Sequence, residues 1–391
     1  MIKKSWFVLL LMVCVAQAQM FGQDYIHLKE LYPDQPVVVL NKKEEIVVSY
    51  KKSKLGINIK VTEELMYMDN TARSYNSGSV YHGTFTSINK IKAHSEIPKE
   101  GNPGKYRKKK VKSFVSTNVN STGIFYDDQK ELGFQYAGLV EGAKTVLTYE
   151  ESVSDPKFLG RNFFSYAMPT LHSVVSISVP ENVKIGYELI NVDTNVVKYS
   201  VVKKRGNTTH TWEGRKLKGN KAFGNGVDMS HYVPHIIIYF KTIQHKDSLE
   251  TILLNTQALY DWYYKIVKDV NGVKSEALKS ITDSLLADVN DIQEKAKKIY
   301  YWVQDNIKYV AFEDGMGGFV PREASLVCQR RFGDCKDMSS ILVEMLKYAG
   351  IKGHLTWIGT RDLPYKYSEI HTPAVDNHMI ASYNYNGKTV F

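Results

Sequence analysis

Cysteine is scarce in this sequence, with only three residues among 391. Cys14 lies in an N-terminal segment that we expect to be removed, which leaves Cys328 and Cys335. Two cysteines in a long exported chain cannot build a disulfide framework, so the fold has to depend on buried apolar cores. The two thiols could still bridge each other. Such a bridge would disturb the helix start expected at Cys335, so we favour free thiols.

Long apolar runs are missing after the N-terminal segment. Two lysines precede the run Trp6–Ala16, and Ala16-Gln17-Ala18 provides a small-x-small cleavage site. This pattern predicts a signal peptide over residues 1–18, and the run is too short to cross a bilayer. Val13 stands where a lipoprotein signal has a small residue, so lipid anchoring at Cys14 is the weaker alternative. We expect an exported chain without a transmembrane segment, in the periplasm or on the surface of a bacterium.

Neither sign of charge dominates strongly, since 51 Lys and Arg residues face 41 Asp and Glu residues, for a net charge of +10. The excess is spread out, apart from one dense basic run at Lys105–Lys110. We interpret this run as protection of an exposed loop or edge strand against pairing with other chains, in preference to a nucleic-acid site. The length and the 43% of hydrophobic residues predict two or three domains with substantial cores.

Helical periodicity is nearly absent between Val47 and Trp212. Apolar and polar residues alternate there in segments separated by turn residues, most clearly at Leu55–Val61, Val175–Val179 and Val197–Val201. Less regular strand-like runs include Val111–Val119, while Asp24 to Asn41 shows little pattern. Many strands with frequent turns predict an antiparallel β-sandwich. We place this domain at residues 42–228, ending in a linker rich in Gly, Lys and Asn.

The character of the chain changes after this domain. A strand at Pro234–Phe240 and a helix from Thr256 would make a connecting region over residues 229–275. Apolar residues then recur at steps of three and four from Leu278 to Ile307, with Asn290 marking a break between two helices. The fold class that we predict is multidomain, with β structure first and an α+β region over residues 276–391.

The stretch Arg330–Gly350 carries the strongest chemical signal. Asp334 is a good N-cap, Asp337 stands where a capping box places its reciprocal acid, and Gly350 provides a left-handed C-terminal stop. Cys335 therefore occupies the first turn of an amphipathic helix. Free backbone N–H groups and the positive end of the helix dipole favour a thiolate there, so Cys335 is the candidate nucleophile.

A cysteine nucleophile needs a base, and three downstream histidines compete for this role. His354 begins an expected strand, His371 lies in a loop, and His378 begins a strand of a hairpin that turns at Asn386-Gly387. Spacing alone favours His378 without excluding the other two. A metal site made by His371, Asp376 and His378 is a weak alternative, because their spacing fits no common motif.

The sequence also resembles a known family. The segment Tyr301–Val310, the residues Gly318–Ala324 and the run Gly333-Asp334-Cys335-Lys336-Asp337 are similar to the papain-related, transglutaminase-like superfamily. More narrowly, the chain resembles bacterial exported proteins that join such a core to an N-terminal domain of the DUF3857 type. The resemblance implies an N-terminal β-sandwich followed by a papain-like, transglutaminase-like α+β core.

The resemblance further implies that Cys335 is the catalytic nucleophile and His378 the catalytic base. It places the third member of the triad, an aspartate, on the strand after that of the histidine, just past Phe391. We therefore expect the printed sequence to be truncated at its C-terminus. The backbone N–H of Cys335 would be one oxyanion donor, with Tyr309 or Trp302 as a second, although core packing is the favoured role for both.

The leading hypothesis is a thiol acyl-transfer enzyme that hydrolyses an amide or passes the acyl group to an amine, as a transglutaminase does. Peptide or protein amides in the cell envelope would be its substrates, and we expect no cofactor, metal or nucleic acid. Arg322, Arg330 and Arg331 would either attract a carboxylate-bearing substrate or only cover surface. The alternative is a non-catalytic binding or scaffold protein of the cell envelope with a degenerate core.

Overall fold

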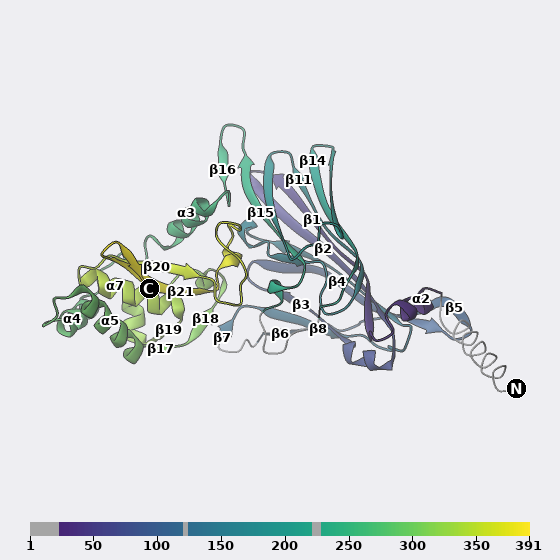
Figure 1. Cartoon of the computed structure of the whole chain (residues 1–391), viewed down its shortest axis with the longest axis horizontal. Helices are drawn as coiled ribbons and strands as arrows, with labels where there is room; N and C mark the ends of the chain where they lie inside the picture. The colour runs from purple at the N-terminus through teal and green to yellow at the C-terminus, as the bar shows by residue number, and fades with distance from the viewer. Residues whose placement is uncertain (1–22, 120–123, 221–227) are drawn as a thin grey trace. The chain divides into compact units, whose positions relative to one another are not determined.

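The computed structural model describes residues 23–119, 124–220 and 228–391, and the chain divides into two compact units (Figure 1). One unit, here called the β unit, comprises Met1–Thr117 and Lys130–Leu249. The other, here called the Cys335 unit, comprises Asn118–Gln129 and Glu250–Phe391. The predicted signal peptide lies outside the described residues. No helix in the described part of the chain is long and apolar enough to cross a membrane.

An eight-stranded sheet is the main element of the β unit, in the order β13-β14-β11-β1-β2-β9-β4-β5. Its strands are β1 (Val37–Lys51), β2 (Lys54–Tyr67), β4 (Thr86–Lys99), β5 (Asn102–Lys110), β9 (Lys144–Val153), β11 (Thr170–Pro180), β13 (Val197–Lys204) and β14 (Asn207–Leu217). All neighbouring pairs in this sheet are antiparallel except β1 and β11, which run parallel. The predicted β-rich N-terminal half is confirmed, with this one pair departing from a purely antiparallel arrangement.

Two smaller sheets accompany the main one in the β unit. Their orders are β10-β15-β12 and β3-β8-β6. The strands are β3 (Ser77–His82), β6 (Val115–Asn118), β8 (Lys130–Gln135), β10 (Arg161–Phe163), β12 (Val183–Ile190) and β15 (His235–Gln244). The apolar strand predicted at Pro234–Phe240 is thus β15, whose first six residues are all buried. The strand predicted at Val111–Val119 is shorter than expected, because only β6 within it pairs.

The start of the β unit departs from the sequence prediction. Asp24 to Asn41, which showed little pattern, contains helix α2 (Gln23–Leu31) and the first residues of β1. Val37, Val38 and Val39 are all at most 6% exposed. A strand that is covered on both faces loses the alternation on which strand prediction depends. Tyr25 of α2 packs in the same small core as Val38, which explains the missing signal.

The basic run Lys105–Lys110 lies on β5, which is an edge strand of the eight-stranded sheet. The turn before it lies at Glu100-Gly101, because Asn102 of β5 already pairs with Lys99 of β4. The run is therefore on an edge strand and not in a loop.

The Cys335 unit contains the helices predicted for the C-terminal half. They are α3 (Thr256–Val267), α4 (Glu276–Leu285), α5 (Ile292–Asn306) and α7 (Cys335–Tyr348); a further helix, α6 (Ala324–Arg330), was not predicted. The break between α4 and α5 is confirmed, but its cap is Asp291 and not Asn290. The apolar faces of α4 to α7 share one core that includes Leu278, Ile299 and Ile341, each fully buried.

A three-stranded antiparallel sheet, β20-β21-β22, packs against α7. Its strands are β20 (Gly353–Ile358), β21 (His378–Tyr385) and β22 (Lys388–Val390). The hairpin predicted at Asn386-Gly387 is confirmed, since both residues have positive φ angles, 50° and 75°. Short strands complete the unit: β7 (Ile124–Asp127), β17 (Lys308–Tyr309), β18 (Ala311–Glu313) and β19 (Phe332–Gly333). Strand β16 (Leu249–Thr251), which begins at the last residue of the β unit, pairs with β15.

Five 3₁₀ turns connect these elements in the described residues. They are η1 (Asn70–Tyr75), η2 (Pro156–Phe158), η3 (Met229–His231), η4 (Gly315–Gly318) and η5 (Pro373–Val375).

Candidate active site

The start of α7 has the local geometry predicted from the sequence. Asp334 accepts hydrogen bonds from the backbone N–H groups of Lys336 at 2.9 Å and Asp337 at 3.2 Å. Asp337 in return accepts from the N–H of Asp334 at 3.2 Å, which completes the capping box. Cys335 is thereby fixed as the first residue of the helix, and it is 9% exposed. Its neighbouring backbone N–H groups and the helix dipole favour negative charge on the sulfur.

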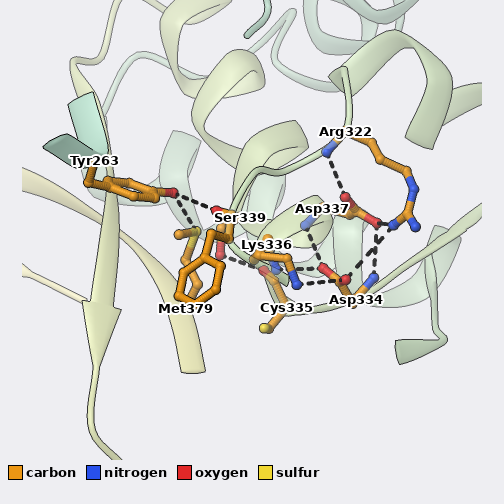
Figure 2. Close-up of polar contacts among 9 residues, drawn as sticks. Tyr263, Arg322, Asp334, Cys335, Lys336, Asp337, Ser339 and Met379 are labelled. Carbon is orange, nitrogen blue, oxygen red and sulfur yellow. Dashed lines mark hydrogen bonds and ion pairs between the residues drawn. The ribbon is translucent and has the colours of Figure 1, made fainter. Parts of the chain in front are cut away.

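A buried ionic cluster surrounds this cap (Figure 2). The Lys336 ammonium donates to Asp334 at 2.8 Å, and both side chains are almost completely buried. The guanidinium group of Arg322 donates to Asp337, and the backbone N–H of Arg322 donates to the same carboxylate at 2.8 Å. We call Arg322, Asp334, Lys336 and Asp337 the cap cluster. Its two acids and two bases balance in charge, as buried ions require.

The sequence did not reveal the role of Lys336, because a helical lysine is usually at the surface. The three arginines near the nucleophile differ in their surroundings. Arg322 is part of the cap cluster, whereas the guanidinium of Arg331 lies 5.2 Å from the ring centre of Trp302. Arg330 is exposed in the last turn of α6. Arg322 and Arg331 therefore have partners within the protein.

The structure brings Cys335 and His378 to one cavity of about 700 Å³ in the Cys335 unit. Cys335 comes from the first turn of α7, and His378 begins β21, opposite Ile358 of β20. Since β20 and β21 pack against α7, the histidine strand is held beside the helix that carries the thiol. The other two histidines do not line this cavity. His354 is exposed on β20, and His371 lies 2.9 Å from the carbonyl of Tyr367.

Aromatic and aliphatic side chains make up most of the cavity wall. No aspartate or glutamate is among the described residues that line it, which are Gln293, Ala296, Lys297, Tyr300, Tyr301, Val303, Gln304, Tyr309, Cys335, Met338, Ser339, Leu342, Leu346, His378, Met379, Ile380, Ala381, Tyr383, Val390 and Phe391.

Tyr309 and Trp302 have different surroundings. Tyr309 lines the cavity, because β17 pairs with β19 and places Tyr309 opposite Gly333, two residues before the nucleophile. Trp302 packs against the helical core and does not line the cavity. A further tyrosine that sequence reasoning missed, Tyr263 of α3, donates to the carbonyl of Phe319 at 3.2 Å and lies beside the sulfur of Met379 (Figure 2). Burial raises the pKa of the Tyr263 hydroxyl, so it stays protonated.

The partner of Asp376 is a tyrosine, whereas the alternative metal site would need this carboxylate to act with His371 and His378. The hydroxyl of Tyr367 donates to its carboxylate, and burial raises the pKa of Asp376 to about 6. Among the described residues, no three His, Cys, Asp or Glu side chains are grouped so that they could hold a metal ion. The alternative metal site at His371, Asp376 and His378 thus gains no support.

Cys328 and Cys335 are not joined by a disulfide. Cys328 belongs to the helical core, where burial raises the pKa of its thiol. Both cysteines are buried, but Cys335 lines the cavity and Cys328 does not. Only Cys328 therefore has the enclosed apolar surroundings that make a cysteine inert.

Comparison with known families agrees with these features. Residues 279–378 match the transglutaminase-like superfamily, and residues 97–220 match DUF3857, a domain of unknown function. The region that contains the cavity is therefore a transglutaminase-like core. The two matches lie in the order that the sequence resemblance predicted, a DUF3857 domain first and a transglutaminase-like core after it. No curated protein matches the chain.

Among solved structures, the chain is similar to a crystal structure from Parabacteroides distasonis ATCC 8503 described as a "putative protease". The TM-score is 0.69 at 16% identity, over 90% of this chain and 66% of that one. The likeness shows a shared fold, and this chain spans somewhat less than two thirds of that protein. An M1 zinc metallopeptidase from Deinococcus radiodurans matches 54% of this chain and 44% of its own, at 9% identity. Its TM-score of 0.28 is too low to support an argument.

Proposed function

We propose that this protein is an exported thiol acyl-transfer enzyme in which Cys335 is the nucleophile and His378 the base. The observation that carries the proposal is that a helix-start cysteine and a strand-start histidine line one cavity. A nucleophile and a base held on separate rigid elements are the minimum that this chemistry requires. Membership of the transglutaminase-like superfamily supports the same assignment.

In the proposed reaction the sulfur of Cys335 attacks an amide carbonyl, and the proton of the thiol moves to His378. The tetrahedral intermediate collapses to a thioester when His378 returns this proton to the departing amine. Water or a second amine then attacks the thioester, loses a proton to His378 and releases the sulfur. Water gives hydrolysis, and an amine gives transfer. We favour hydrolysis of peptide amides, because the similar Parabacteroides structure is described as a protease.

Two groups would stabilise the oxyanion of the tetrahedral intermediate. The first is the backbone N–H of Cys335, at the positive end of α7. The second is the hydroxyl of Tyr309, which lines the cavity with the thiol, whereas Trp302 does not. Of the two donors considered from the sequence, Tyr309 is thus the better candidate.

The third member of the proposed triad is an aspartate past Phe391, where the resemblance places it. It would orient His378 and stabilise its protonated form. Loss of the orienting acid lowers turnover in such triads about ten-thousandfold. A comparison of the printed chain with a version extended at its C-terminus would test this assignment by turnover of a peptide substrate.

Export is also part of the proposal, through a signal peptide at residues 1–18. Peptide or protein amides of the bacterial envelope would then be the substrates that the enzyme meets. Expression with a C-terminal tag, followed by cell fractionation and N-terminal sequencing, would test this. A mature chain that begins at Gln19 is the expected result, and an uncleaved cytoplasmic chain would contradict it.

Alkylation with iodoacetamide tests the nucleophile directly. We expect Cys335 to react at pH 7 at least about tenfold faster than N-acetylcysteine, because its thiolate is favoured. Cys328 serves as the internal control and should react far more slowly, since it is buried in the helical core. Mass spectrometry distinguishes the two sites. In His378→Ala the fast reaction should move to higher pH, and a Cys335 that reacts no faster than the free thiol would overturn the assignment.

A further inference from the structure

Strand β5 presents an unusual edge of the β unit. It ends the eight-stranded sheet and pairs with β4 on one side, and no described strand pairs with its other side. Eight of its nine residues are exposed. The exception is Tyr106, which has the ammonium of Lys144 at 5.1 Å from its ring centre. Tyr106 thus attaches the strand to the sheet while the other side chains face solvent.

The charge of this edge is strongly positive. Residues 99–112 contain seven basic side chains and one acidic one, Glu100, for a net charge of +6. The basic residues are Lys99, Lys105, Arg107, Lys108, Lys109, Lys110 and Lys112. Lys108 pairs with Glu96 of β4 at 3.0 Å. Within the described part of the chain, the other six have no ion pair, so their charge is available to a partner.

Protection of an edge strand does not account for so many charges. Charged side chains, especially lysine, are only one of several devices that keep an edge from pairing with other chains. The opposite edge of the same sheet, β13, is an edge strand with fewer charges. It has three lysines, and it leaves Val201 and Val202 exposed to 48% and 60%. The higher density on β5 therefore points to a second role.

We propose that β5 is a docking edge for an anionic phospholipid bilayer. Side chains along a strand alternate between the two faces of its sheet, so Lys105, Arg107 and Lys109 point one way and Lys108 and Lys110 the other. When the edge itself meets a flat surface, both rows can reach it, because long lysine and arginine side chains extend their charged ends toward headgroups. Clusters of four to eight such residues are typical of anionic lipid recognition.

The position of β5 in the chain agrees with this partner. Asp24 of α2 interacts electrostatically with Tyr106, so the strand lies beside the first described helix (Figure 1). An exported chain emerges from the membrane at its N-terminal end. Helix α2 begins shortly after the segment proposed as the signal peptide, and β5 lies beside this helix.

Sedimentation with lipid vesicles tests the proposal on the full chain. Vesicles of 30% phosphatidylglycerol in phosphatidylcholine are compared with pure phosphatidylcholine at low and at physiological salt. The variant Lys105→Glu/Lys109→Glu removes charge from β5. The matched control is Lys198→Glu/Lys203→Glu on β13, which changes the net charge by the same amount at the opposite edge. Circular dichroism confirms that both variants fold, and Lys105→Gln/Lys109→Gln repeats the test without charge reversal.

The expected result is binding to the anionic vesicles that weakens with salt and is absent with phosphatidylcholine alone. The β5 variant should lose at least about tenfold in partition coefficient, and the β13 variant less than about twofold. Equal losses in both variants would show that net charge alone accounts for the binding, and this result would overturn the proposal. Binding to a heparin column without binding to the vesicles would also overturn it, in favour of a soluble polyanion. None of these outcomes depends on the activity of Cys335.

Discussion

Asp337 accepts two hydrogen bonds from Arg322, one from the backbone N–H at 2.8 Å and one from the guanidinium group. The same carboxylate caps the N–H of Asp334. One fully buried acid therefore joins the loop before α6 to the first turn of α7 (Figure 2). The position of the candidate nucleophile depends on a contact between residues fifteen apart in the sequence as well as on its own helix.

The first prediction concerns this contact. Asp337→Asn should lower the free energy of unfolding by about 2–3 kcal/mol, because it leaves the cap cluster with one positive charge in excess. This is below the value for a fully buried pair, since the side chain of Arg322 is 31% exposed. Urea unfolding measures the change. The control Asp305→Asn removes an exposed acid of α5 and should change stability by less than about 0.5 kcal/mol.

A second prediction concerns Gly333, which precedes the cap. A Cβ atom at this position would lie 2.4 Å from the Cβ of Asp337, so Gly333→Ala forces the cap residues apart. We expect a loss of about 1–3 kcal/mol in stability and a slower alkylation of Cys335. Gly317→Ala is the matched control, because a Cβ there meets nothing within 4 Å. Equal behaviour of the two variants would show that the cap tolerates the displacement.

A third prediction is a pH dependence in the β unit. Burial, with a smaller effect from Glu44, raises the pKa of Glu151 to about 7. In the unfolded chain this carboxyl titrates near pH 4.5. Between these values the folded state binds the extra proton, so the free energy of unfolding falls as the pH rises from about 4.5 through 7. Glu151→Gln should reduce this decrease, to which the raised pKa of Asp376 also contributes, and make the protein more stable at pH 8 by about 1–3 kcal/mol.

The neighbouring residue provides the control for this experiment. Glu150 is on the same strand, its side chain is 40% exposed, and its hydrogen bond with Lys90 lowers its pKa. Glu150→Gln should therefore not flatten the fall in stability toward alkaline pH. Thermal unfolding between pH 4 and pH 8 distinguishes the two variants. A parent protein whose stability did not fall over this range would contradict the assignment to Glu151.

A fourth prediction concerns the pair formed by Tyr367 and Asp376, two residues before His378. Tyr367→Phe should destabilise the protein by about 1–3 kcal/mol at pH 8, where the carboxylate of Asp376 is ionised and loses its donor. At pH 5 the loss should be smaller, because the pKa of Asp376 is about 6 and the carboxyl is then mostly protonated. Tyr264→Phe, at a tyrosine that is 67% exposed, should show no such dependence.

The start of α7 could be predicted from the sequence because its determinants are local. Asp334, Asp337 and Gly350 act within one helix, and the capping box and the left-handed stop both follow from residue type and spacing. The first strand was missed for the opposite reason. Val37–Val39 is buried without alternation, so its strand character comes from the elements that cover it and not from a period in the sequence.

The site itself could be predicted only in part. Cys335 carries its own signal, but the choice among His354, His371 and His378 depends on how β20 and β21 pack against α7. Sequence spacing does not contain that information, and the resemblance to a family supplied it. The partner of Arg322 could not be predicted from the sequence either. A substrate carboxylate and the buried Asp337 would satisfy the same guanidinium group.

The burial of Lys336 has a consequence for the proposed chemistry. An amine beside a thioester can capture the acyl group by an intramolecular shift from sulfur to nitrogen. Such a shift would inactivate the enzyme. Lys336 follows the nucleophile directly, yet its side chain is 2% exposed and its ammonium is paired with Asp334 at 2.8 Å. An amine that is buried and engaged by a carboxylate is not available to attack. In the proposed reaction the cap cluster would thus protect the acyl-enzyme from the amine that follows it in the chain, and the thioester would react with acceptors from solution.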